Sequence, residues 1–356
     1  MKSNPLVSII VIDYKKVNPY LIECLDAIQK QTYTNYEIIL ETDHPKNLKY
    51  PKLKIVDYNG KYIPPAHKRD HAGEIAKGEI LAFIDDDAYP HKDWLKNLVP
   101  NFTDPQITAV GGPGVTPPNV DWAEAASGWA SASPIGAGSY TYRFLPGKKQ
   151  FVDDYPSMNL AVRKADFLKV GGYDSEFWPG EDTKLCLDLT QKLHKKIIYE
   201  PKAIVFHHRR PLMKPHLHQN GNFGLHRGFF AKVLPQTSRR PIYFLPSFML
   251  LGLLYILVTS ILSFRDGTGY INPFLLVRNL GLVLFASYFF ALIFNAIWIF
   301  IKIYNNRHSR PDRESIKIIP IAIFQSLLSI LVIFITHLWY GLRFLQGLLF
   351  TAKLER

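Results

Sequence analysis

The stretch LAFIDDDAYP, residues 81–90, places three carboxylates directly after a run of mostly apolar residues. The run EILAFI (79–84) predicts a buried β-strand, so Asp85, Asp86 and Asp87 would stand where that strand ends. Three adjacent like charges repel one another, so they belong either to a solvated loop or to a site that binds a cation. The order of the elements around them decides between the two.

The chain before this stretch alternates between predicted strands and predicted helices. The unbroken run rich in β-branched residues at 6–12 predicts a buried strand, and three further strands are predicted at 36–42, 52–58 and 79–84. Helices are predicted at 18–32, with Asn18 as the N-cap, and at 65–78, closed by Gly78. The alternation predicts an α/β fold with a mostly parallel sheet and helices on both faces. Ligands of such sheets bind beyond the carboxyl ends of the strands, where residues 85–87 stand.

Asp85 and Asp87 are candidate ligands of a divalent cation. Mg²⁺ and Mn²⁺ prefer oxygen ligands and leave coordination positions to substrate phosphates. Such an ion can take charge from a diphosphate leaving group. A solvated acidic turn is the commoner explanation of such a pair taken alone, so the rest of the chain has to supply a partner.

A second acidic pair lies in WPGEDTKLCLDL, residues 178–189. Glu181 and Asp182 follow a Pro-Gly turn and precede apolar residues at helical spacing, which predicts the N-terminus of a helix. The positive end of the helix dipole stabilises an ionised carboxylate there. A carboxylate in a cleft can then act as general base toward an attacking hydroxyl. An ordinary acidic cap is the alternative.

Several stretches, in this order, resemble the family 2 inverting glycosyltransferases. They are VSIIVIDY (7–14), LIECLDAIQKQTYTNYEIIL (21–40), KRDHAGEIAKGEILAFIDDDAYPHKDWL (68–95), AVGGP (109–113), NLAVRKADFLKVGGYDSEFWPGEDTKLCLDL (159–189) and IIYEPKAIVFHH (197–208). The resemblance covers roughly residues 5–210. It implies a GT-A fold, which is Rossmann-like, and a nucleotide-diphosphate sugar, UDP- or GDP-linked, as donor.

The resemblance also implies roles for single residues. Asp85 and Asp87 fall at the DXD position that binds metal, Mn²⁺ or Mg²⁺, and nucleotide phosphates. Asp182, with Glu181 beside it, falls at the position of the catalytic base. His207, at the end of the predicted strand 196–208, is the third candidate metal ligand.

Three positions depart from the family pattern. Ile-Asp at 12–13 stands where the family often has Pro-Thr, Thr-Asp at 42–43 where it usually has Asp-Asp, and Arg-Asp at 69–70 where Arg-Asn is common. Contacts to the nucleotide sugar are still expected from Asp13, Asp43, Arg69, Asp85 and Asp86.

Residues 207–232 combine His, Arg and aromatic residues just before the first long apolar stretch. Related membrane-bound transferases carry amphipathic interface helices here, with a basic residue that reaches the diphosphate. The candidates for that contact are His207, Arg210, Gln219 and Arg227. A basic stretch that rests on anionic lipid is the alternative, and the scattered His residues lack zinc-ligand spacing. Trp178 is the candidate for stacking on an acceptor sugar, whereas core packing is the commoner role for a residue such as Trp122 or Trp129.

Hydrophobic residues make up 47% of the 356 residues and concentrate after residue 240. Three stretches carry no Asp, Glu, Lys or Arg: 241–264, 280–301 and 318–340. Each has the length of about twenty residues that a helix needs to cross a bilayer core of roughly 30 Å. The predicted organisation is therefore a GT-A domain (1–208), an amphipathic interface segment (209–240) and a transmembrane region with about three helices (241–356).

Basic residues predict the orientation. Arg239 and Arg240 precede the first stretch, and the connection between the second and third carries Lys302, Arg307, Arg310, Arg313 and Lys317. The positive-inside rule then predicts a multi-pass protein of the cell membrane whose catalytic domain faces the cytoplasm. Three spans would leave the tail outside, although it carries Arg343, Lys353 and Arg356. An interfacial tail and a re-entrant span both remain open.

Charge and cysteine content exclude other classes. The formal net charge of +12 fits a domain that rests on an anionic leaflet. No recognition motif supports a nucleic-acid partner. Cys24 and Cys186 are far apart in the sequence, so neither a disulfide nor a cysteine-ligated metal is expected.

Together these features predict a metal-dependent inverting glycosyltransferase of the hexosyltransferase type. Its acceptor would be a hydroxyl of a membrane-associated, lipid-linked saccharide in glycan or polysaccharide assembly. The alternative is transfer to polyprenyl phosphate, as in dolichol-phosphate-mannose synthases; that acceptor is already ionised and needs no base, so the Gly-Glu-Asp motif favours a hydroxyl. Gln219 and Arg227 are too far apart for the QxxRW segment of processive synthases. A non-enzymatic scaffold that binds sugars or nucleotides is the remaining class.

Overall fold

The computed structural model describes residues 4–177, 180–266, 273–308 and 315–354. The chain forms two compact units. The sheet unit comprises residues 1–119, 142–208 and 354–356, and the helical unit comprises residues 120–141 and 209–353. Residues 120–141 thus group with the C-terminal helices. This grouping was not predicted from the sequence.

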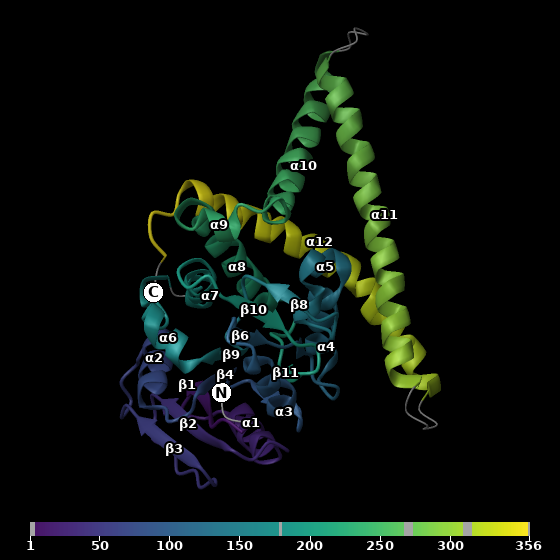
Figure 1. Cartoon of the computed structure of the whole chain (residues 1–356). Helices are drawn as coiled ribbons and strands as arrows, with labels where there is room; N and C mark the ends of the chain where they lie inside the picture. Colours follow the sequence, from purple (N-terminus) through teal and green to yellow (C-terminus); the bar gives the residue numbers. More distant parts are fainter. Residues whose placement is uncertain (1–3, 178–179, 267–272, 309–314, 355–356) are drawn as a thin grey trace. The chain divides into compact units, whose positions relative to one another are not determined.

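An eight-stranded sheet forms the centre of the sheet unit, in the order β3-β2-β1-β4-β9-β6-β10-β8. Its strands are β1 (Val7–Asp13), β2 (Tyr36–Thr42), β3 (Leu53–Asp57), β4 (Ile80–Asp85), β6 (Ile107–Gly111), β8 (Gln150–Val152), β9 (Asn159–Arg163) and β10 (Lys196–Tyr199). Strands β3, β2, β1 and β4 pair in parallel, as do β6 and β10, whereas β9 and β8 pair antiparallel with their neighbours (Figure 1). The predicted mostly parallel α/β sheet is confirmed.

Helices cover both faces of the sheet because its central strands are apolar on both sides. Successive side chains of a strand point to opposite faces. Ile9 of β1 packs in one core with α1 (Pro19–Gln29), and its neighbour Ile10 packs in the other with α2 (Pro65–Ile75). The helices α6 (Lys164–Val170) and α7 (Glu181–Gln191) add to the second core.

Two predicted elements end differently from expectation. The strand predicted at 196–208 is two strands, β10 and β11 (Val205–His207), because a turn with Pro201 at its second position lies between them. The helix predicted at 65–78 ends at Ile75. Gly78 serves close packing instead, because a Cβ there would lie 2.6 Å from the backbone nitrogen of Ser8.

A second sheet of three strands has the order β5-β11-β7, with β5 (Ala88–Pro90) and β7 (Gly114–Val115) on either side of β11. In the antiparallel pair of β5 and β11, His207 lies opposite Ala88. Since Ala88 follows Asp87 directly, this register brings His207 to the acidic run at the end of β4.

The helical unit contains α4 (Trp122–Ala132), α5 (Pro134–Ala137), α8 (Lys214–Val233), α9 (Pro235–Ser238), α10 (Pro241–Asp266), α11 (Pro273–His308) and α12 (Ser315–Leu349). Within it, α10 and α11 form a hairpin and α12 crosses that hairpin (Figure 1). Ala130 of α4 packs with Val332 and Ile333 of α12, which explains why residues 120–141 belong to this unit.

Three of these helices are long and apolar enough to cross a membrane. The apolar stretches are Pro241–Ile261, Leu275–Asn305 and Ile319–Leu349. They include most of each predicted span, and the three helices fit a membrane anchor.

Glycines let α8 and α12 approach backbone to backbone. A Cβ on Gly228 of α8 would lie 2.0 Å from the carbonyl oxygen of Phe344. A Cβ on Gly347 of α12 would lie 2.0 Å from the carbonyl oxygen of Leu225. Small residues at both surfaces are what such close helix packing requires.

Replacing Gly228 by Ala should therefore destabilise the helical unit. The added methyl group meets backbone rather than a flexible side chain, and we expect a loss of about 1–3 kcal/mol in the free energy of unfolding. Thermal unfolding of the detergent-solubilised full chain measures it. Gly252→Ala in α10 is the matched control, because nothing lies within 4 Å of its added Cβ. Equal melting temperatures for the two variants would contradict the packing.

Candidate functional site

The carboxyl ends of three neighbouring strands gather acidic residues at one edge of the sheet. Strand β1 ends at Asp13, β2 is followed by Asp43 and β4 ends at Asp85. Because β1 pairs in parallel with both β2 and β4, these ends meet, with Asp13 opposite Thr42 and Ile12 opposite Asp85. Three basic side chains offset this charge: Lys46, Lys68 and Arg69.

Asp13 is fully buried and held from several sides. Asn18 Nδ2 donates to its Oδ1 at 3.0 Å, Thr42 Oγ1 donates to its Oδ2 at 3.0 Å, and Lys46 Nζ lies 3.0 Å from the same Oδ2. Burial by itself raises the pKa of Asp13, but these hydrogen bonds and the Lys46 charge outweigh it and lower the pKa. Asp13 is therefore ionised and fixed.

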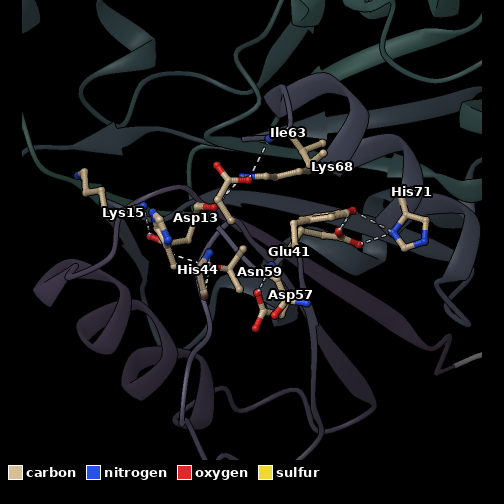
Figure 2. A network of polar contacts seen from close by, with 12 residues as sticks. Asp13, Lys15, Glu41, His44, Asp57, Asn59, Ile63, Lys68 and His71 are labelled. Atoms are coloured by element: carbon tan, nitrogen blue, oxygen red, sulfur yellow. Dashed lines mark hydrogen bonds and ion pairs between the residues drawn. The ribbon is translucent and has the colours of Figure 1, made fainter. Parts of the chain in front are cut away.

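Lys68 connects the first two strand ends. Its Nζ donates to the carbonyl oxygen of Asp13 at 2.7 Å and lies 2.8 Å from Asp43 Oδ1, while the side chain is almost completely buried. The Ile63 N–H donates to the same Asp43 oxygen at 3.0 Å. Figure 2 shows Lys68 pointing from α2 into this group. Lys68 was not predicted from the sequence, where its one signal is its position beside Arg69.

A second contact ties α2 to the sheet. The Glu41 side chain in β2 is fully buried, accepts a hydrogen bond from Tyr58 Oη at 2.5 Å, and lies 2.7 Å from Nδ1 of His71 (Figure 2). Lys68 and His71 thus anchor the same helix to two strands, on either side of Arg69.

Asp86 differs from Asp85 and Asp87 in its hydrogen-bond partner, and the pKa of its own carboxyl group is raised. Asn18 Nδ2 donates to Asp86 Oδ2 at 2.5 Å. Burial, together with the nearby charge of Asp87, raises the pKa of Asp86 to about 8. Asn18 occupies the predicted N-cap position of α1, but its side chain makes no capping hydrogen bond and joins Asp13 to Asp86 instead.

Among the described residues, one group of three can hold a metal ion: Asp85, Asp87 and His207. One ligand atom from each lies within 4.8 Å of the others, and His207 Nε2 is 3.2 Å from Asp87 Oδ1. Two carboxylate oxygens and one imidazole nitrogen suit a divalent cation. The structure brings the three predicted metal ligands together.

Arg69 bridges the two acidic motifs. One terminal guanidinium nitrogen lies 3.1 Å from Asp85 Oδ1 and the other 2.8 Å from Glu181 Oε1. Burial by itself would lower the pKa of Arg69, but the two carboxylates outweigh it and raise that pKa. Glu181 also accepts a hydrogen bond from the Gly180 N–H at 2.8 Å and is buried. Both partners of Arg69 are therefore held in place across the site.

Asp182 lies next to Glu181 in the first turn of α7, where the sequence predicted a helix start. Its Oδ1 accepts a hydrogen bond from the Thr183 N–H at 2.8 Å, and the side chain is half-buried. The helix dipole stabilises a negative charge at this position.

Two predicted site residues belong to the second compact unit. Arg210 and Arg227 belong to the helical unit, where Arg227 lies over the Tyr243 ring at 4.9 Å and donates to Ser238 Oγ at 3.3 Å. Their contact with a donor stays a prediction. Trp178 lies outside the described residues.

Residues 8–166 match the family model described as Glycosyl transferase family 2. This range contains the strand ends from Asp13 to Asp87 and ends before α7. The match therefore covers the acidic strand ends of the candidate site, whereas Glu181, Asp182 and His207 lie beyond it.

Two curated relatives match part of the chain. A pre-mycofactocin glycosyltransferase of Mycobacterium tuberculosis is 28% identical over 164 residues, which cover 45% of this chain and 33% of that protein. A glucosyl-dolichyl phosphate glucuronosyltransferase of Haloferax volcanii is 22% identical over 202 residues, which cover 52% of this chain and 63% of that protein. The chain thus spans less than two thirds of the length of either relative.

Among solved structures, the mannosyltransferase PcManGT from Pyrobaculum calidifontis, in complex with GDP-Man and Mn²⁺, resembles this chain. The TM-score is 0.51 at 17% sequence identity, and the match covers 93% of this chain and 88% of that one. At this identity the likeness concerns the fold, which is GT-A-like.

Asp70 follows Arg69 and titrates near neutral pH. Its Oδ1 accepts a hydrogen bond from the Tyr173 N–H at 2.7 Å, while burial raises its pKa to about 7. A carboxyl whose pKa is raised on folding favours the folded state less as the pH climbs from its unfolded pKa toward its folded one.

Asp70→Asn should therefore stabilise the protein at alkaline pH. Asn keeps an oxygen that accepts from Tyr173 and removes the cost of a buried charge. We expect a gain on the order of 1–2 kcal/mol near pH 8 that shrinks toward pH 4. Thermal unfolding across this range measures it, with the exposed Asp104→Asn as control. A gain independent of pH would contradict the assignment.

Proposed function

We propose that this chain transfers a sugar from a nucleoside-diphosphate donor to an acceptor hydroxyl, with inversion at the anomeric carbon, because residues 8–166 match the model of glycosyl transferase family 2. One observation carries the proposal: Asp85, Asp87 and His207 converge at the carboxyl edge of the sheet. That edge is where α/β sheets bind nucleotides, and a donor diphosphate needs positive charge there.

Asp85, Asp87 and His207 would hold a Mn²⁺ or Mg²⁺ ion. When bound, the ion supplies positive charge to the departing diphosphate. The donor set of the three side chains fits a divalent cation, and the register of β11 on β5 keeps His207 beside Asp87. We assign Asp13, Asp43 and Asp86 to the nucleoside side of the pocket, where Lys46, Lys68 and Asn18 hold them in place.

Asp182 would act as the general base. It takes the proton of the acceptor hydroxyl while that oxygen attacks the anomeric carbon on the face opposite the leaving diphosphate. Glu181 is the weaker candidate for this step, because it is buried and already paired with Arg69. Arg69 and Glu181 are thus positioning residues that hold the metal ligands and the base in one arrangement.

A membrane-associated acceptor fits the three apolar helices that follow the transferase domain. We propose a lipid-linked saccharide. Transfer to polyprenyl phosphate itself is the second candidate, because the Haloferax volcanii relative is a glucosyl-dolichyl phosphate glucuronosyltransferase. The two differ in chemistry, because only the hydroxyl has a proton that a base must remove.

The metal site predicts a metal-dependent donor interaction. UDP or GDP should raise the melting temperature of the full chain in Mn²⁺ and lose this effect in EDTA. Asp87→Asn should raise the nucleotide concentration needed for the same Mn²⁺-dependent shift in melting temperature by about tenfold, because it removes a direct metal ligand. Asp104→Asn is the control, since Asp104 precedes β6 and so lies at the opposite edge of the sheet. Equal shifts with and without metal would contradict the assignment.

Replacing the base separates the two acceptors. Asp182→Asn should lower sugar transfer to a hydroxyl acceptor by about 10²–10⁴-fold without changing donor binding. Glu176→Gln, an exposed acidic residue shortly before it, should leave transfer unchanged. If Asp182→Asn transfers to polyprenyl phosphate at the wild-type rate while Asp87→Asn does not, the phosphate acceptor is correct.

A further inference from the structure

The contacts of α12 bear on how many times the chain crosses the membrane. Length and composition alone would make α10, α11 and α12 three spans. The ends of these helices, however, are not arranged as in a bundle of three crossing helices.

The first two helices form an antiparallel hairpin. A Cβ on Gly281, early in α11, would lie 3.1 Å from Ile256 Cδ1, in the second half of α10. The start of α10 and the end of α11 therefore lie at one end of the hairpin, its open end, and the end of α10 and the start of α11 lie at the other, its closed end.

The C-terminal part of α12 contacts the start of α10. The Phe244 and Phe344 ring centroids are 4.7 Å apart, and Ser247 Oγ donates to the Gly341 carbonyl oxygen at 3.0 Å. A Cβ on Gly341 would lie 2.5 Å from the carbonyl oxygen of Pro246. The last turns of α12 thus lie at the open end of the hairpin.

The N-terminal part of α12 contacts the late turns of α11. Ala322 packs in one apolar cluster with Ile299 and Ile303. Both ends of α12 therefore meet the open end of the hairpin. A third crossing helix that started at the end of α11 would instead finish beside the closed end.

The neighbours of α12 support the same placement. Its last turns run along α8, a helix with many polar residues: His216 Nε2 lies 3.0 Å from Thr336 Oγ1, and Lys232 Nζ donates to the Thr351 carbonyl oxygen at 2.5 Å. Among the described residues, candidate spans begin at Pro241, so α8 lies on the side from which α10 enters the membrane.

The side chains of α12 divide between the protein and its surroundings. Gln325, Ser326 and Ser329 are almost completely buried, together with the apolar Val332 and Ile333. Large apolar side chains are exposed: Ile319, Ile323, Leu327, Leu331 and Leu342. Such an exposed apolar face can contact lipid acyl chains in a helix that crosses the bilayer and in one that lies in its interface, so the contacts of the two helix ends decide the placement.

We infer that the chain crosses the membrane twice, through α10 and α11, and that α12 lies along the bilayer surface on the side of the transferase domain. Its exposed apolar face contacts lipid acyl chains. This placement removes the conflict in the charge pattern. The basic connection before α12 and the tail with Arg343 and Lys353 both face the leaflet side that positive charge prefers.

Cysteine labelling in sealed membrane vesicles of known orientation tests the inference on the full chain. Single substitutions Asn4→Cys, Thr268→Cys and Lys353→Cys mark the sheet unit, the connection between α10 and α11, and the tail. Asn4 and Lys353 are exposed, and the native Cys24 and Cys186 are fully buried, so the unsubstituted chain is the blank. A membrane-impermeant maleimide should label Asn4→Cys and Lys353→Cys from one side and Thr268→Cys from the other.

Labelling of Lys353→Cys from the same side as Thr268→Cys would mean three spans and would overturn the inference. Labelling of all three from one side would overturn it as well, because α10 and α11 would not cross. Both results leave the proposed sugar transfer untouched, since neither concerns the sheet unit.

Discussion

The site depends on one ion-pair network, in which the buried Arg69 guanidinium holds Asp85 and Glu181 at the same time. These carboxylates belong to motifs almost a hundred residues apart, one after β4 and one at the start of α7. Without a cation between them, the half-buried Asp85 carboxylate and the buried Glu181 carboxylate would repel each other. Arg69 can bridge the two carboxylates because its helix, α2, is itself fixed to the sheet through Lys68 and His71. The position of a helix thus sets the position of the acidic residues.

Most of the sheet could be predicted because its strands carry their own signal. Residues 7–13 and 80–85 are buried on both faces, and such strands are unbroken apolar runs. Helix and strand ends were less predictable. Gly78 was predicted to close a helix, but it meets the backbone of Ser8, a contact between residues seventy positions apart. Packing of this kind leaves no local pattern.

The candidate site shows the same division. Asp85, Asp87 and His207 could be named because the resemblance puts the acidic pair at a DXD position after a predicted strand and because His207 lies at the end of another. Lys68 and the role of Asn18 could not be named, because a lysine on a helix and an asparagine before one have common local explanations. Only the parallel pairing of β1 with β2 and β4 brings their partners within reach. The placement of α12 could not be predicted either, because its composition is that of a membrane span whereas the contacts of its two ends are not those of a third crossing helix.

The central claim is that Asp85, Asp87 and His207 bind a divalent cation together with the donor diphosphate. Pulsed electron paramagnetic resonance of Mn²⁺ bound to the protein, recorded with UDP or GDP, tests it directly. The account predicts coupling of the ion to one imidazole nitrogen and to the phosphorus nuclei, with the nitrogen coupling lost in His207→Ala. Mn²⁺ that shows phosphorus coupling but the same nitrogen coupling in both proteins would contradict it, as would a failure to bind Mn²⁺ in the presence of nucleotide.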